Sequence, residues 1–144
     1  MQPGHQTRES LSEAGWRERT LSGFADRMGP LWTRKEEDGW AYGILAGAEH
    51  LNPAGFVHGG VLCALFDHMI SAVAWEAAGR QPCVTVQLGT QFLAAAREGQ
   101  FLEARGRVTR LASTLVFAEG AIATGEVEVL RGTSVQKIMP RPAA

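Results

Sequence analysis

The sequence predicts an α+β fold in which a curved antiparallel sheet of about six strands wraps around one long central helix. One long apolar segment that stops at a glycine supplies the helix, and four strand-like segments fill the second half of the chain. The length of 144 residues fits one domain. A chain of this size buries roughly two thirds of its surface and needs no disulfide or metal to stabilise it.

Short helical pieces are predicted ahead of the sheet. Ser10-Leu11-Ser12-Glu13 fits a capping box and would begin the first of them. Thr20 could cap a second, whose apolar residues fall at helical spacing until Gly29-Pro30 ends it. Residues 31–37 and 40–45 then flank Asp38-Gly39, a pair typical of a type I′ hairpin turn because both central residues need positive φ.

The central helix is predicted over residues 59–78 and is stopped by Gly79. Apolar side chains occur on nearly every face of this segment, which predicts a buried helix rather than an amphipathic one.

The remaining strands form the second half of the chain. They are predicted at residues 82–94, 100–111, 114–123 and 127–138. Alternation at Val84, Val86 and Leu88 is clear and is typical of a strand. Short turns join the segments, so we expect antiparallel neighbours. The edge strands need cover, which a homodimer that joins two sheets edge to edge would provide.

Composition excludes several classes of function. Lys and Arg number 14 and Asp and Glu 15, a balance that argues against nucleic-acid binding. No run of 18 residues is apolar and uncharged, so we expect no membrane span, and the N-terminus lacks the apolar core of a signal peptide. Cys63 and Cys83 alone make neither a disulfide framework nor a zinc site, and His50, His58 and His68 lack a ligand spacing. We expect no metal and a cytoplasmic location.

The sequence His58-Gly59-Gly60 stands where a loop becomes the central helix. The first N–H groups of a helix lack intrahelical partners, and the helix dipole adds partial positive charge there. Two glycines would let an anion or a polarised carbonyl oxygen approach the backbone closely. The alternative is a glycine-containing helix start that packs tightly on a strand.

Asp67 lies inside the apolar helix. Its neighbours three and four residues away, Cys63, Ala64, Ile70 and Ser71, are small or apolar. No Lys or Arg is within helical reach to neutralise the carboxylate, and burying an unpaired carboxylate is costly. Either hydrogen bonds satisfy Asp67, or the residue stands in a cleft for a chemical purpose.

The stretch from Asn52 to Asp67, N-P-A-G-F-V-H-G-G-V-L-C-A-L-F-D, resembles the signature of the hotdog-fold acyl-CoA thioesterases. It is most similar to the group that contains the phenylacetate-pathway and hydroxybenzoyl-CoA thioesterases. That group has an amide residue six positions before the histidine of H-G-G and an acidic residue nine positions after it. Asn52 and Asp67 stand at these two places.

The similarity continues downstream, over roughly residues 21–140. Residues 84–88 resemble the strand that follows the helix in this family, and Phe92-Leu93 with residues 97–99 resembles the family's turn. Ala95 replaces the family's proline, which predicts a looser turn. The chain then divides into an N-terminal extension (1–19, partly helical or disordered), a single hotdog thioesterase domain (20–140) and a tail (141–144).

The resemblance implies an acyl- or aryl-CoA thioester hydrolase without a cofactor. The Gly59 N–H would hold the thioester carbonyl oxygen, and Asp67 would act as general base on water or as a nucleophile. Asn52 would orient the water or the thioester. Ser71 and Thr85 match hydroxyl positions that some relatives use near the water.

Two further roles concern the rim of the site. His58 would brace the loop before the helix rather than move protons. Arg97 and Arg110 could meet the phosphates of CoA, although arginines at strand ends are often only solvated charges.

Gly59 and Asp67 are eight residues apart, which is about 12 Å along one helix. One carbonyl group cannot contact both residues in the same subunit. We therefore expect the site to form across the interface of a homodimer or of a dimer of dimers, an arrangement for which the family is known.

Two alternatives remain open. The first is a hotdog-fold dehydratase or hydratase, which uses a histidine and an acid on an acyl chain. The second is an acyl-CoA-binding protein without turnover. The amide before H-G-G favours the thioesterase over the first, and the presence of both Asn52 and Asp67 argues against the second.

Overall fold

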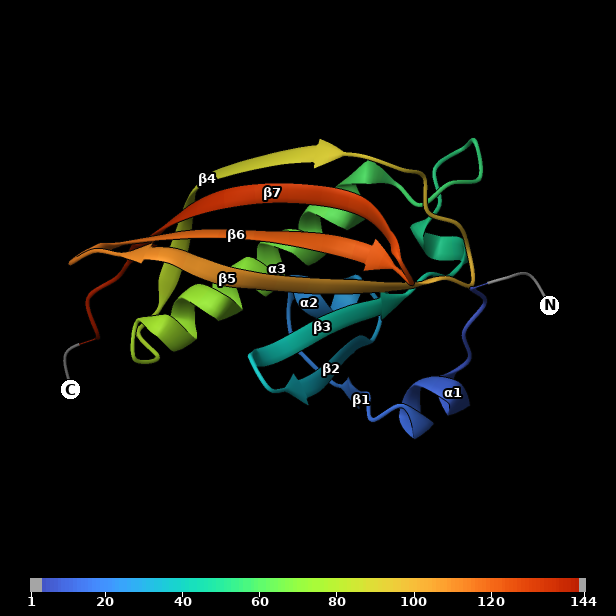
Figure 1. Ribbon diagram of the computed structural model, residues 1–144, viewed down its shortest axis with the longest axis horizontal. Coiled ribbons are helices and arrows are strands. Elements are labelled where there is room, and N and C mark those ends of the chain that lie inside the picture. The colour runs from blue at the N-terminus through green and yellow to red at the C-terminus, as the bar shows by residue number, and fades with distance from the viewer. Residues whose placement is uncertain (1–3, 143–144) are drawn as a thin grey trace.

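A computed structural model describes residues 4–142 and shows one antiparallel sheet of seven strands curved around one long helix (Figure 1). This confirms the predicted α+β architecture. The elements in chain order are α1 (Arg8–Glu13), β1 (Arg17–Arg19), α2 (Phe24–Arg27), β2 (Leu31–Glu36), β3 (Gly39–Leu45), a 3₁₀ turn (Ala48–His50), α3 (Gly59–Ala77), β4 (Cys83–Phe92), β5 (Phe101–Leu111), β6 (Leu115–Thr124) and β7 (Val127–Ile138).

The strands follow the order β1-β2-β3-β5-β6-β7-β4 across the sheet. Antiparallel pairing of neighbours is confirmed for β5, β6 and β7 but wrong for β4, which pairs with β7 instead of β5. The connection between β4 and β5 is too long for a hairpin. It is anchored to the loop before α3, where the Val57 N–H donates to the Ala96 carbonyl at 2.8 Å. As a result β4 is an edge strand.

The N-terminal elements begin at residues other than those predicted. Thr7 caps α1, and Ser10 stands at the third helical position, where the two residues exchange hydrogen bonds between side chain and backbone. A serine therefore fills the place usually taken by glutamate in a capping box. Gly23 rather than Thr20 precedes α2, which is a single turn. The three-residue β1, too short to show alternation, is the strand that the sequence missed.

The β2–β3 hairpin exists, but its turn lies one residue earlier than predicted. Glu36 pairs with Gly39, so Glu37 and Asp38 form the turn. Within residues 4–142, Arg80 is the one non-glycine residue with positive φ, and Gly39 carries a φ of +131° after the turn. The turn is therefore not type I′. In this register Gly43 pairs with Trp32, and on β3 it lies beneath the ring of Phe101.

Helix α3 packs directly against the backbone of three glycine residues in the middle of the sheet. Gly106, Gly120 and Gly132 pair across β5, β6 and β7. A Cβ added at Gly106 or Gly120 would come within 2.9 Å of the Met69 side chain, and one at Gly132 would stand 3.0 Å from Phe66. Both side chains are fully buried in the main core. Three neighbouring glycines thus let the sheet curve closely around the helix.

Only the sheet-facing side of α3 is buried in the single chain, contrary to the prediction of a helix buried on all faces. Cys63, Asp67, His68 and Ser71 are half-buried on the other side. By length and composition α3 could cross a membrane, but its apolar residues are those of a helix packed under a sheet. The half-buried side is where the candidate site begins.

Candidate active site

The N-terminus of α3 offers one free backbone donor. His58 caps the helix, and its Nδ1 accepts a hydrogen bond from the Gly60 N–H at 2.9 Å. The Gly59 N–H donates to none of residues 4–142. A side chain at Gly59 would stand 3.2 Å from the ring of Phe92. Gly59 is thus the donor that remains at the positive end of the helix dipole.

Asn52 holds the loop that leads into α3. Its Oδ1 accepts hydrogen bonds from the N–H groups of Ala54 (3.0 Å) and Phe56 (3.1 Å). The loop also closes through the backbone, where the Asn52 N–H donates to the Phe56 carbonyl at 2.7 Å. The side-chain oxygen is therefore occupied, and the side-chain NH₂ makes no hydrogen bond within residues 4–142.

A buried histidine supports the same loop from behind. His50 is 4% exposed. Its Nδ1 accepts from the Gly47 N–H at 2.9 Å, so Nε2 carries the proton that is donated to the Met28 carbonyl at 2.6 Å. The His50 carbonyl in turn accepts from the His58 N–H at 2.8 Å. His50 is therefore a structural residue of the loop.

Asp67 lies about two turns further along α3, half-buried on the side that the sheet leaves open. The Thr85 hydroxyl donates to its Oδ1 at 2.6 Å, and Oδ2 makes no hydrogen bond within residues 4–142. No arginine or lysine of these residues forms an ion pair with it. Burial lowers the pKa of the adjacent His68, against the opposite effect of the Asp67 charge.

A polar network supports Asp67 from inside the sheet. Gln136 on β7 is fully buried, and its Nε2 donates to the Thr85 hydroxyl at 3.0 Å and to the Ser134 hydroxyl at 2.7 Å. The Ser134 hydroxyl donates to the Gln87 carbonyl at 3.1 Å, and the Ser71 hydroxyl reaches the Gln136 Oε1 at 3.4 Å. Sequence reasoning missed Gln136 and Ser134. The sequence signal that could have indicated them is an amide and a hydroxyl residue two positions apart in one strand, which lie on the same face of the sheet.

A β-bulge at Val86 directs Thr85 into this network. Thr85 pairs with Gln136, but Gln87 pairs with Val135, so one extra residue is inserted. After it, Leu88 pairs with Ser134 and faces the helix, whereas Val84 pairs with the exposed Lys137. The alternation at 84, 86 and 88 therefore does not continue on one face of β4. A bulge of this kind aims a side chain at a site.

The predicted site residues form two groups in one chain. The donor half-site comprises Asn52, His58 and Gly59 at the start of α3, and the acid half-site comprises Asp67, Ser71 and Thr85. Eight residues of helix, about 12 Å, separate Gly59 from Asp67. Each half-site therefore lacks the other group within the chain. Among residues 4–142, no three His, Cys, Asp or Glu side chains gather as a metal site.

The predicted arginines do not lie together. The Arg97 guanidinium stands 4.7 Å above the ring of Phe56, near the donor half-site. Arg110 is near the far end of β5, about 30 Å from the start of that strand at the usual rise per residue. One cluster of phosphates therefore cannot contact both from the same chain. Neither forms an ion pair within residues 4–142.

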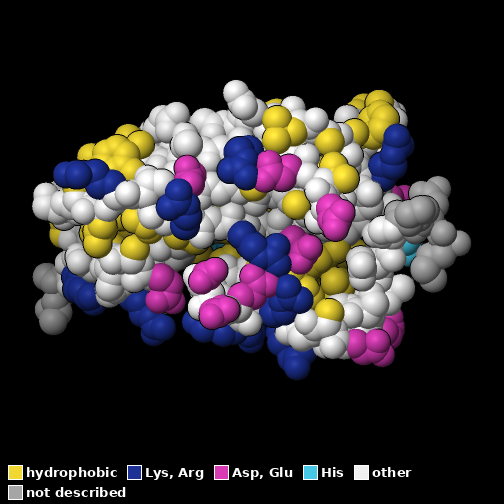
Figure 2. Space-filling model, viewed as in Figure 1, with side chains coloured by type: hydrophobic (Ala, Val, Ile, Leu, Met, Phe, Trp, Pro, Cys, Tyr) yellow, Lys and Arg dark blue, Asp and Glu magenta, His cyan; other side chains and the backbone are white. Residues whose placement is uncertain are grey.

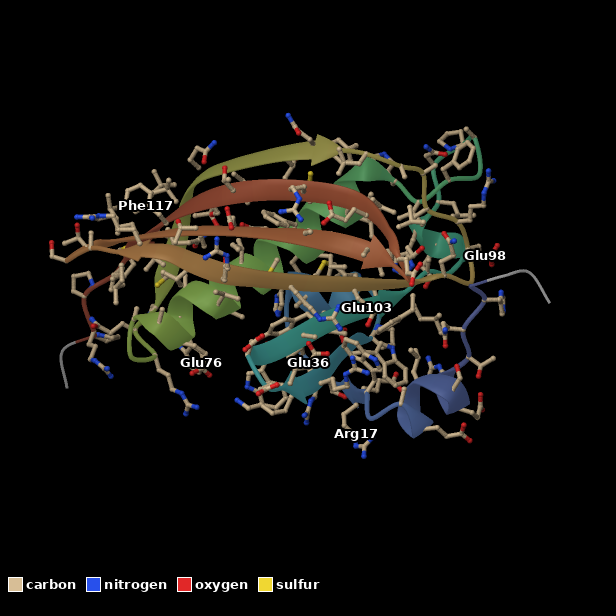
Figure 3. The ribbon with its side chains drawn as sticks, viewed as in Figure 1. Arg17, Glu36, Glu76, Glu98, Glu103 and Phe117 are labelled. Carbon is tan, nitrogen blue, oxygen red and sulfur yellow. The ribbon has the colours of Figure 1, made fainter. Side chains whose placement is uncertain are left out.

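The outer face of the sheet carries interleaved charges (Figure 2). Arg105 pairs with Glu36 at 2.7 Å and with Glu103 at 3.2 Å, and both glutamates are labelled in Figure 3. The hydrogen bond from Arg105 lowers the pKa of Glu36 to about 2. A hollow of about 680 Å³ lies over Glu36 and Arg105, and neither Asp67 nor Gly59 lines it. This hollow is on the opposite side of the sheet from α3.

Comparison with known proteins identifies the family. The family model described as "Thioesterase superfamily" matches residues 54–130, more than half of the chain. A candidate esterase of Pseudomonas aeruginosa is 32% identical over 116 residues, which cover 79% of this chain and 87% of that protein.

Solved structures share the fold. Zebrafish thioesterase superfamily member 2 superposes with a TM-score of 0.74 at 20% identity, over 83% of this chain and 88% of that one. A hypothetical thioesterase of Streptococcus pneumoniae, solved with coenzyme A, gives a TM-score of 0.69 at 23% identity over 78% and 88% of the two chains. The chain belongs to the thioesterase superfamily, and it is a hotdog-fold thioester hydrolase.

Proposed function

We propose that the protein hydrolyses acyl- or aryl-CoA thioesters to the free acid and CoA at a site shared between two subunits. The observation that carries this proposal is the state of Asp67. It is a carboxylate in an apolar helix, held at Oδ1 by Thr85, and within residues 4–142 it has no ion-pair partner and no hydrogen bond at Oδ2. Keeping such a charge half-buried is costly, and a role in proton transfer accounts for it.

In this mechanism the Gly59 N–H donates to the thioester carbonyl oxygen. Negative charge develops on that oxygen as the carbonyl is attacked, and the helix dipole stabilises it there. His58 supports this step indirectly, because it occupies the Gly60 N–H and fixes the first turn of the helix. The free NH₂ of Asn52 is left to orient the water or the thioester.

Asp67 supplies the basic group. As a general base its Oδ2 takes a proton from water, and the water oxygen forms a bond to the carbonyl carbon. The bond from that carbon to sulfur then breaks, and the proton held by Asp67 passes to the departing thiolate, which releases CoA and restores the carboxylate. As a nucleophile, Asp67 would form an anhydride that water then hydrolyses. In a single turnover in ¹⁸O-labelled water, an unlabelled product acid together with a labelled Asp67 would establish the nucleophilic route, in which water attacks the Asp67 carbonyl carbon of the anhydride.

A two-fold symmetric dimer would join the half-sites. In an isologous interface, the donor half-site of one chain can face the acid half-site of its partner, and the reverse holds at the second site. The edge strand β4 is open for such pairing. Val84 (48% exposed) and Val86 (59%) lie on it, and Phe92 (54%) and Leu93 (52%) at its end. Large apolar side chains on an unpaired edge need cover in water.

Coenzyme A is the carrier that we propose for the acyl group. The Streptococcus pneumoniae structure with coenzyme A supports this choice. Arg97 and Arg110, two exposed arginines that form no ion pair within residues 4–142, could meet its phosphates, each at a different site of the dimer.

The test is a hydrolysis screen with acetyl-, butyryl-, benzoyl- and phenylacetyl-CoA, with crotonyl-CoA as the substrate of a hydratase. We expect release of free CoA from at least one thioester and no hydration of crotonyl-CoA. The histidines favour this outcome, because Nδ1 of His58 is bound to the Gly60 N–H and His68 packs edge-on against Tyr42. Hydration without hydrolysis would assign the dehydratase class, and tight binding without turnover would assign a binding protein.

A further inference from the structure

The hydrogens of the buried network can be assigned one by one from its fixed end. The Gln87 carbonyl can only accept, so the Ser134 hydroxyl donates its single proton there at 3.1 Å. The Ser134 oxygen is then left to accept from the Gln136 Nε2 at 2.7 Å. The second hydrogen of that NH₂ group is donated to the Thr85 oxygen at 3.0 Å.

The direction of the last bond follows. Thr85 accepts from Gln136 and has one proton to donate. Its oxygen lies 2.6 Å from the Asp67 Oδ1 and 3.4 Å from the Gln136 Oε1, so the proton is donated to Asp67. The chain of donors thus runs in one direction, from the amide of Gln136 through Thr85 to the carboxylate.

We infer that Gln136 is a positioning residue for hydrolysis, which fixes the Thr85 hydroxyl as a donor to Asp67 Oδ1 and so keeps Oδ2 for the reacting water. This inference rests on the proposed function of Asp67. Gln136 is fully buried and cannot touch the substrate itself. Its Oε1 also accepts from the Ser71 hydroxyl at 3.4 Å, so both hydroxyls of the acid half-site meet this one amide.

Two substitutions at this position probe different properties. Gln136→Met keeps the length of the side chain but gives no hydrogens to Thr85. Ser134 and Thr85 still have acceptors for their own protons in this variant, and the half-buried Ser71 hydroxyl loses only its 3.4 Å contact with Oε1. Gln136→Glu keeps the shape, but a carboxyl group has at most one proton to donate where the amide has two. At least one of the Ser134 and Thr85 oxygens then loses the hydrogen that it accepts from position 136.

The experiment is a double-mutant cycle between Gln136→Met and Thr85→Val, measured with the fastest substrate among acetyl-, butyryl-, benzoyl- and phenylacetyl-CoA. We expect Gln136→Met to lower kcat about 10-fold with KM nearly unchanged, because loss of one buried hydrogen bond is worth about that factor. In the Thr85→Val background the same change should lower kcat less than about twofold.

Thr33→Val is the matched control. Thr33 is also a buried polar residue, and its hydroxyl oxygen accepts a hydrogen bond from Arg19. It lies on β2, away from the strands that hold the network. We expect this variant to lower the melting temperature at most, with kcat per folded molecule unchanged. If Gln136→Met does not fold, Gln136→Glu replaces it in the same cycle.

The outcomes separate this inference from the function on which it rests. An unchanged kcat in Gln136→Met overturns the inference, and so does an equal loss in the Thr85→Val background, because that loss would not pass through Thr85. Asp67→Asn is measured beside them. If it keeps the wild-type rate, the proposed function fails as well. If it is inactive while the cycle is additive, only the positioning role of Gln136 is wrong.

Discussion

The two oxygens of Asp67 have different surroundings, and this difference is the chemical core of the site. Oδ1 accepts the Thr85 hydroxyl at 2.6 Å, whereas Oδ2 has no hydrogen-bond partner within residues 4–142. A carboxylate held on one side keeps a fixed orientation and presents the other oxygen for proton transfer.

Asp67→Asn is expected to fold normally and to lose about 10²–10⁴-fold in kcat, the usual range for a missing general base. The amide still accepts the Thr85 hydroxyl through its oxygen, so the packing should survive. Removing a half-buried charge should leave the melting temperature equal or higher. Steady-state kinetics and thermal unfolding of the same sample test both points, and near-normal hydrolysis would move the base elsewhere.

At the scale of single residues, the sequence predicts the site residues whose chemical role shows in their immediate sequence neighbours. A charge inside an apolar helix marked Asp67, and H-G-G at the helix start marked Gly59. Gln136 could not be found this way, because it is 69 residues further along the chain and polar residues alternate in any half-exposed strand. Only the pairing of β7 with β4, and the bulge at Val86, turn it toward Thr85.

The close packing of α3 on the sheet depends on glycine residues in the strands. Gly106 and Gly120 face Met69 from adjacent strands. A methyl group at Gly120 would stand 2.6 Å from the Arg105 carbonyl oxygen, which belongs to the backbone. At Gly106 the nearest atoms, at 2.8 Å, are the flexible ends of Met69 and Ile70.

Gly120→Ala should therefore destabilise the protein more than Gly106→Ala. Overpacking of a core typically costs about 1–3 kcal/mol, and Gly120→Ala belongs at the upper end because the backbone cannot retreat as side chains can. Urea unfolding of both variants measures the two differences in the free energy of unfolding. An equal or smaller loss for Gly120→Ala would contradict the packing described for α3.

The ion pairs of the outer face predict a dependence of stability on pH. The hydrogen bond from Arg105 lowers the pKa of Glu36 from 4.5 to about 2. A lowered carboxyl pKa gives stability that is fully present above about pH 4.5 and is lost as the pH falls toward 2. Glu36→Gln should cost about 1 kcal/mol at pH 7, since partly exposed pairs are screened.

The loss caused by Glu36→Gln should shrink between pH 4.5 and 2, the two pKa values of Glu36. Unfolding curves over this range measure the free-energy difference from wild type. Glu18→Gln is the control, because Glu18 pairs with Arg8 in an exposed place and should change stability little. A difference that stays constant down to pH 2 would show that Glu36 is not the group that titrates.

The predicted strand positions of the second half agree with the structure within a few residues, because turns and β-rich segments are local signals. The order of the strands in the sheet could not be predicted from such local signals. That β4 crosses to pair with β7 depends on the anchoring of the connection beside the loop before α3. The start of α1 was placed three residues late, since Thr7 and Ser10 form a capping box without an acid.

The whole molecule has an open side as a single chain. Helix α3 is covered by the sheet on one face only, and β4 leaves Val84 and Val86 exposed at the edge. We expect a dimer with twice the mass of 15.5 kDa in light scattering at micromolar concentration. Both half-sites would then be completed at once.

Val86→Lys should shift this dimer toward the monomer and lower hydrolysis in parallel, because a charge on an edge strand opposes pairing. Val127→Lys is the matched control. Val127 is 54% exposed, similar to Val86 at 59%, but it begins β7 instead of lying on the edge. Light scattering and activity are measured on both variants. A Val86→Lys dimer with normal activity would place the interface elsewhere.

The most direct test of the shared site is rescue between two inactive variants. Asp67→Ala removes the acid half-site, and Asn52→Ala removes the amide that holds the loop of the donor half-site. Mixed under conditions of subunit exchange, about half of the dimers contain one chain of each kind, as two-fold symmetry requires. One of the two sites in each mixed dimer is then intact. We predict recovery to about a quarter of the wild-type activity by this count. No recovery, with subunit exchange demonstrated, would contradict the shared site, because every site within a single chain would lack one of the two groups.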